Sequence, residues 1–132
     1  MTSDHLFVYG TLMRGFDHPM ARLLAANAEF IGAASCRGRL YLVRHYPVLV
    51  LSDDPADIVH GELFRLREVG ALLREFDMYE ASGEGFAEPT EYVRKMLAVT
   101  LADGTAGEAW TYVYNWPVTE LPRIASGRFL DH

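Results

Sequence analysis

The sequence predicts an α+β fold in which a mainly antiparallel, barrel-like sheet is accompanied by two helices. Residues 19–27 and 68–80 carry apolar side chains at helical spacing, whereas much of the remaining chain alternates and is rich in β-branched and aromatic residues. Most of these strand-like runs follow one another with short turns, which favours antiparallel pairing. The sequence contains no repeating strand–helix–strand series and no Gly-x-Gly-x-x-Gly motif, so it does not indicate a dinucleotide-binding fold.

Length and composition indicate one domain, residues 1–132, with its own hydrophobic core. Half of the residues are hydrophobic, and the one cysteine, Cys36, excludes an internal disulfide. A single cysteine and the lack of a charged-then-apolar leader favour a reducing, cytoplasmic location. The formal net charge of −6 disfavours nucleic acid as a partner, and no apolar run approaches the length of a membrane span. The sequence does not indicate an oligomeric state.

The first elements are expected to be a short buried strand and a helix. Residues 6–9 are apolar and end at a glycine, as expected of a buried strand. Pro19 suits the first turn of a helix, with Asp17 or His18 as the capping residue. Helical spacing then continues to about Asn27, where the helix is expected to end.

Strands dominate the rest of the chain. Residues 38–52 predict two strands with a turn near positions 45–47, and residues 57–67 predict another, with Gly61 as a possible bulge. Residues 91–115 predict a hairpin that turns at Asp103-Gly104, a strong hairpin signal. The C-terminal segment beyond it is rich in proline and glycine and is expected to be irregular.

The second helix places a carboxylate where an apolar side chain is expected. Leu72, Leu73 and Phe76 form one apolar stripe at 100° per residue, and Glu80 falls in the middle of that stripe. In one interpretation the helix ends one turn earlier, which leaves Glu80 in a solvated loop. Alternatively, Glu80 is buried near the helix C-terminus, where burial and the macrodipole raise its pKa and suit it to act as a general base.

The loop after the first strand also has two interpretations. Tyr9, Gly10, Thr11 and Leu12 follow a buried strand, and no helix begins until several residues later. Gly10 could simply end the strand in a tight turn. The other interpretation is a loop whose backbone N–H groups are free to bind a ligand, with Gly10 allowing a close approach because it lacks a Cβ.

Several motifs, taken in order, resemble one family over nearly the whole chain. They are FVYGTLMRG, GRLYLVRHYPVLV, VHGELFRL, EFDMYE, YVRKMLAV and AWTYVYN. Together they resemble the γ-glutamylcyclotransferase superfamily, and in particular its small γ-glutamylamine-cyclotransferase-like branch. The resemblance implies a small mixed β-barrel flanked by helices, and an enzyme that cyclises a γ-glutamyl group to 5-oxoproline with release of an amine or amino acid.

The resemblance also implies the site residues. The family's substrate-binding loop corresponds to residues 9–12, and its catalytic glutamate corresponds to Glu80. No metal or cofactor is implied, and the substrate is a small γ-glutamyl compound. Ala81 replaces the glycine that usually follows the glutamate, and the segment from Ala81 to Thr90 is long and acidic, which affects the expected leaving group.

The remaining side chains that could take part in binding or catalysis indicate a function less clearly. Tyr114 is a possible substrate contact, although buried tyrosines more often pack and satisfy one hydrogen bond. Arg94, on a strand, suits a structural ion pair better than catalysis, and Cys36 suits core packing. The five histidines lack metal-ligand spacing. The alternative to an enzyme is a non-catalytic small-molecule-binding or interaction protein on the same fold, but such a protein would have no need to retain Glu80.

Overall fold

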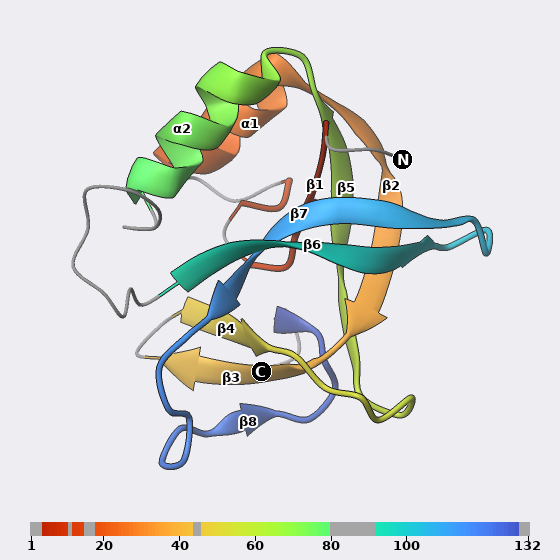
Figure 1. Cartoon of the computed structure of the whole chain (residues 1–132), viewed down its shortest axis with the longest axis vertical. Helices are drawn as coiled ribbons and strands as arrows, with labels where there is room; N and C mark the ends of the chain where they lie inside the picture. The colour runs from red at the N-terminus through yellow and green to blue at the C-terminus, as the bar shows by residue number, and fades with distance from the viewer. Residues whose placement is uncertain (1–3, 11, 15–17, 44–45, 80–91, 130–132) are drawn as a thin grey trace.

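The structure is a computed structural model that describes residues 4–10, 12–14, 18–43, 46–79 and 92–129. Within this part of the chain, five strands close into a barrel (Figure 1). Neighbouring strands pair antiparallel, except that β1 and β7 are parallel where Leu6 meets Trp110. The predicted α+β class and the mixed, mainly antiparallel barrel are therefore confirmed. In barrel order the strands are β1 (His5–Val8), β5 (Ile58–Leu66), β2 (Ala28–Arg37), β6 (Tyr92–Leu101) and β7 (Ala106–Tyr114).

A smaller three-stranded sheet lies beside the barrel. Its order is β4 (Tyr46–Val50), β3 (Arg39–Val43) and β8 (Arg123–Ile124). Leu40 pairs with Leu49 on one side and with Ile124 on the other, and all three side chains are buried. The two-residue strand β8 lies in the C-terminal segment that was expected to be irregular.

The described residues contain two helices, which lie together at one end of the barrel (Figure 1). Helix α1 (Pro19–Asn27) begins as predicted: the Nδ1 atom of His18 accepts a hydrogen bond from the N–H of Met20, at 3.1 Å. Helix α2 spans Val69–Tyr79. Its predicted apolar stripe is confirmed, because Leu72, Leu73 and Phe76 are all buried.

The structure adds one strand and corrects one expectation. Residues 28–37, for which the sequence pattern gave no prediction, form β2, which pairs with β5 on one side and β6 on the other. The bulge lies in β2, between Phe30 and Gly32, and not at Gly61. Gly61 has a different requirement: a Cβ there would overlap the carbonyl group of Val8, because β1 passes directly beside it.

The predicted hairpin between β6 and β7 is present. Tyr92 pairs with Tyr114 at its open end, and Thr100 pairs with Ala106 beside the turn. Gly104 has a φ of 91°, a left-handed conformation that glycine adopts at little cost. The turn predicted at Asp103-Gly104 is therefore confirmed, and the N–H of Gly104 donates to the carbonyl oxygen of Leu101 at 2.9 Å.

Candidate functional site

The end of β1 is anchored to the neighbouring strand by a tyrosine side chain. Tyr9 is buried, and its hydroxyl donates a 2.6 Å hydrogen bond to the carbonyl oxygen of Tyr112 in β7. The next residue, Gly10, lies against β4. A Cβ on Gly10 would come 2.6 Å from Cγ of Pro47, so a larger residue would force the proline ring to move. Gly10 is thus required by packing, in addition to any role in ligand binding.

Two backbone N–H groups of the loop that follows form hydrogen bonds within the protein, although the sequence suggested that the loop N–H groups were free to bind a ligand. The N–H of Met13 donates to the carbonyl oxygen of Gly10 at 3.0 Å, and the N–H of Arg14 donates to Glu62 at 2.7 Å. Among the hydrogen bonds formed by the described residues, none engages the N–H of Gly10 or Leu12.

Side chains also hold this loop in place. Leu12 and Met13 are buried in the core, so Leu12 faces away from solvent and has only its backbone to offer a ligand. The guanidinium of Arg14 lies 3.4 Å from the centre of the Phe30 ring and contacts Glu62 through Nε at 3.3 Å. Thr11, the remaining predicted residue of the loop, lies outside the described residues.

The last turn of α2 is bound to the barrel through Asp77. Its Oδ1 atom accepts hydrogen bonds from the Tyr112 hydroxyl at 2.7 Å and from Nε of Arg94 at 2.8 Å. Its Oδ2 atom accepts a second hydrogen bond from Arg94, from Nη2 at 3.2 Å. The pair is bidentate and about three-quarters buried, with side-chain exposures of 24% for Arg94 and 21% for Asp77. The ion pair expected for Arg94 is therefore present.

Aromatic side chains continue the same surface of the β6–β7 hairpin. Tyr114 follows Tyr112 by two residues, so both side chains lie on one face of β7. The rings of Tyr114 and its cross-strand partner Tyr92 meet edge to face at 5.5 Å. Trp116, which is 44% exposed, packs against Tyr114 at 6.3 Å. Tyr114 thus lies beside Tyr112 on the same hairpin face.

The structure therefore brings together some, but not all, of the residues expected to form the site. Tyr9 is hydrogen-bonded to Tyr112, which connects the end of β1 to α2, and Tyr114 lies two residues further along β7. Glu80 directly follows Tyr79, the last described residue of α2, and itself lies outside the described residues. Sequence reasoning missed Tyr112 and the connecting role of Asp77. Only the alternation of Tyr112 with Tyr114, and the position of Asp77 three residues before Glu80, could have pointed to them.

Other titratable groups have roles in the fold. Burial raises the pKa of the Cys36 thiol to about 12, in keeping with the packing role expected for it. Among the described residues, no group of three or more His, Cys, Asp or Glu side chains is placed to hold a metal ion. None of the described helices is both long and apolar enough to cross a membrane.

Comparison with known proteins identifies the family. The family model "Gamma-glutamyl cyclotransferase, AIG2-like" matches residues 6–131. The chain belongs to the gamma-glutamylcyclotransferase family. Membership of this family supports a cyclotransferase activity in general terms, and the chain is 35% identical to the gamma-glutamylcyclotransferase family protein YtfP of Escherichia coli K12 over 129 residues, which is 96% of both chains.

Solved structures of the gamma-glutamylcyclotransferase family have the same fold. An AIG2-like protein from mouse superposes with a TM-score of 0.70 and 26% identity, covering 93% of this chain and 86% of the mouse chain. The solution structure of YtfP from Escherichia coli superposes with a TM-score of 0.63 and 33% identity, covering 96% of both chains. The barrel and its helices are thus the family architecture.

Proposed function

We propose that this protein is a cyclotransferase that converts a γ-glutamyl amide into 5-oxoproline and releases an amine or an amino acid. Glu80 acts first as the general base and then as the general acid. The loop of residues 9–12 binds the substrate, and Tyr114 is a further contact. The reaction needs no cofactor, because it is an intramolecular acyl transfer in which positioning supplies much of the rate.

The observation that supports this proposal is a series of hydrogen bonds that connects the end of β1 to the last turn of α2 through β7. Tyr9 donates to the backbone of Tyr112, and the Tyr112 hydroxyl donates to Asp77 in the last turn of α2. Glu80 follows Asp77 by three residues in the sequence. β7 therefore holds the end of β1, which precedes the loop in the sequence, and the last turn of α2, which precedes Glu80.

The chemistry explains why a carboxylate is needed. The α-nitrogen of the γ-glutamyl group attacks its own γ-carbonyl carbon, a new C–N bond closes the ring, and the bond to the leaving nitrogen breaks. The α-nitrogen is an ammonium at neutral pH, so a base must first remove a proton. Of its three hydrogens, one remains on the ring nitrogen and two pass to the leaving nitrogen, which departs as an ammonium. A single carboxylate at Glu80 can relay these protons in turn.

The loop supplies the complementary electrostatic stabilisation. An oxyanion develops on the γ-carbonyl oxygen during the attack, and the α-carboxylate of the substrate also needs hydrogen-bond donors. The N–H groups of Gly10 and Leu12 are the described donors in the loop that can serve either role. Tyr9 and Arg14 are hydrogen-bonded to β7 and β5, and Met13 is hydrogen-bonded to Gly10 within the loop, so these donors are held in place before the substrate binds.

Replacement of the carboxylate tests the assignment. Glu80→Gln keeps the size of the side chain and removes the base, so we expect a folded protein that loses about 10²-fold to 10⁴-fold in kcat, the range for general acid–base catalysis. Mass spectrometry of 5-oxoproline formed from a panel of γ-glutamyl amides measures this loss, and circular dichroism checks the fold.

A second variant at the other end of the same helix is the matched control. Glu68 is exposed immediately before α2, so Glu68→Gln also removes one negative charge and should leave kcat within about twofold. Near-native turnover by Glu80→Gln would refute the role of Glu80. If the unmodified protein forms no 5-oxoproline from any γ-glutamyl amide and yet binds one, the alternative of a non-catalytic binding protein is correct.

The leaving group of the proposed reaction is expected to be an amine, not an α-amino acid, because the sequence around Glu80 is acidic. Asp77 is paired with Arg94, so its charge is already compensated. If the other carboxylates face the mouth of the site, each would disfavour an anionic leaving group by about 1 kcal/mol or less. These residues are Glu75, Glu84, Glu88 and Glu91. We expect kcat/KM to favour γ-glutamylamines at low salt, and equal values for an amine and its matched amino acid would refute this.

A further inference from the structure

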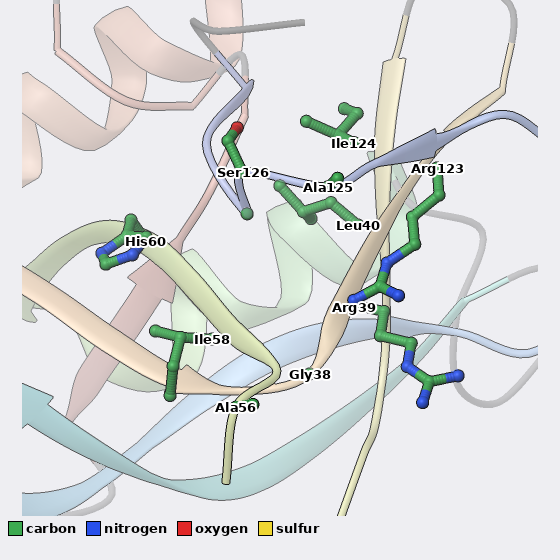
Figure 2. Close-up of a pocket in the computed structure, with 11 residues that line it drawn as sticks. Gly38, Arg39, Leu40, Ala56, Ile58, His60, Arg123, Ile124, Ala125 and Ser126 are labelled. Carbon is green, nitrogen blue, oxygen red and sulfur yellow. The ribbon is translucent and has the colours of Figure 1, made fainter. Parts of the chain in front are cut away.

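Apart from the candidate site, a pocket opens where the small sheet meets the beginning of β5. Its volume is about 270 Å³, and it is lined by residues from the β2–β3 corner, from β5 and from the segment that begins at β8. In Figure 2 the arginine side chains lie on one side, and Ile58, His60 and Ser126 lie on the other. None of these residues belongs to the loop of residues 9–12 or to the aromatic surface around Tyr114.

The walls of this pocket are tied together by hydrogen bonds. The N–H of Gly38 donates to the carbonyl oxygen of Asp57 at 2.9 Å, which holds the β2–β3 corner against the chain leading into β5. The N–H of His60 donates to the carbonyl oxygen of Gly127 at 2.8 Å, which holds the C-terminal segment against β5. Gly127 has a φ of 70°, and a Cβ there would overlap the carbonyl group of Ile58. The pocket is therefore formed in advance by its backbone.

A buried aspartate positions the two arginines of the pocket. Asp57 Oδ2 accepts from Nε of Arg39 at 2.6 Å, and Asp57 Oδ1 accepts from Nη2 of Arg123 at 2.8 Å. Ser52 donates to Asp57 as well, at 2.7 Å. Hydrogen bonds from Ser52, Arg39 and Arg123 lower the pKa of Asp57 to about 2, so this carboxylate is ionised at neutral pH.

The charge of this cluster is positive in a protein that is acidic overall. Two guanidinium groups share one carboxylate, which leaves a net charge of 2 − 1 = +1, whereas the whole chain carries −6. Each arginine side chain is 41% exposed, and one Nη2–H of Arg123 accounts for its hydrogen bond to Asp57. A guanidinium has five N–H donors in a planar fork that matches the oxygens of carboxylates and phosphates. Arg123 therefore keeps donors for an anion.

We propose that this pocket is a second ligand site that binds a small oxyanion, either a carboxylate or a phosphate, through Arg123 and Arg39. The two sources share the same recognition chemistry, namely two oxygens facing a guanidinium fork. A volume of about 270 Å³ lies just below the usual range of small-molecule pockets, so the ligand is a compact molecule of a few carbon atoms or inorganic phosphate. Ser126 lies in the opposite wall of the pocket (Figure 2).

Titration of the full chain, followed by the amide signals of Gly38, Ser126 and Gly127, tests this site. Sodium phosphate and sodium acetate are added separately, with sodium chloride at matched ionic strength as the reference. We expect saturable shifts confined to the pocket with at least one of the two anions. Saturation with only one of them identifies the source, and shifts that do not saturate or that chloride reproduces would overturn the site.

Two variants and one control separate binding from folding. Arg123→Gln should weaken the apparent affinity at least tenfold. Ala125→Leu, at an exposed lining position, should block binding without changing the charge, and it decides the matter if Arg123→Gln does not fold. Arg65 lies on β5 outside the pocket and pairs with Asp4, so Arg65→Gln should leave the affinity for the anion unchanged. Equal affinity in all of these variants would overturn the proposal.

Discussion

The ion pair between Asp77 and Arg94 should stabilise the fold by more than a surface pair does, and a double-mutant cycle can measure it. Asp77→Ala removes the carboxylate at the end of α2, and Arg94→Met removes the guanidinium on β6 while keeping an unbranched side chain. Arg94 also lies over the Trp110 ring at 4.4 Å, and Asp77 also accepts from Tyr112. Each of these contacts is lost in one single variant and again in the double variant, so both cancel in the cycle.

The expected coupling energy follows from the geometry. Exposed pairs couple by about 0.2–1 kcal/mol, because water screens them and two long side chains must be ordered. Here the two hydrogen bonds measure 2.8 Å and 3.2 Å, and both side chains are less than a quarter exposed. Bidentate geometry and partial burial increase the attraction, while desolvation opposes it. We therefore expect a coupling free energy of about 1–2 kcal/mol.

Urea denaturation of the four proteins gives the free energies of unfolding, and a second pair serves as the control. Arg65 and Asp4 are joined by one contact at 3.1 Å, and the Arg65 side chain is 59% exposed. The cycle of Asp4→Ala with Arg65→Met should give less than about 1 kcal/mol. Free energies for the Asp77 and Arg94 variants that add to within about 0.5 kcal/mol would refute the reasoning.

Three further outcomes are expected. Gly10→Ala should lower the free energy of unfolding by about 1–3 kcal/mol, because the added methyl group clashes with Pro47. Gly70→Ala is the control, since its added methyl group meets nothing within 4 Å, and equal melting temperatures of the two variants would contradict the clash. The pKa of Asp57 is about 2 in the folded protein and 3.8 ordinarily, so the stability that its carboxylate contributes is complete above pH 4 and is lost as the pH falls from about 4 to about 2. In urea denaturation across this range, the free energy of unfolding of Asp57→Asn should therefore depend less on pH than that of the unmodified protein, and parallel curves would contradict this. Because burial raises the pKa of Cys36 to about 12, iodoacetamide at pH 8 should label the native protein far more slowly than the unfolded one, and equal rates would mean that the thiol is accessible.

Much of the fold could be predicted because its signals are local. Pro19 with a capping His18, the apolar stripe of α2 and the Asp-Gly turn each depend on residues only a few positions apart. The strand β2 could not be predicted in this way. Its sequence AEFIGAASCR contains three alanines and a glycine, which have little intrinsic preference for strands. It is a strand because β5 and β6 lie on either side and pair with its backbone.

The candidate site divides in the same way between local and long-range information. The sequence by itself determined the glycine that ends the first strand, the helix that leads to Glu80, and the family to which both motifs belong. Only the tertiary structure decided what connects them: Tyr9 is 103 residues from Tyr112, and Tyr112 is 35 residues from Asp77. Hydrogen bonds over such separations depend on the register of β7 against β6 and on the closure of the barrel between β1 and β7, and no local pattern of residues encodes that closure.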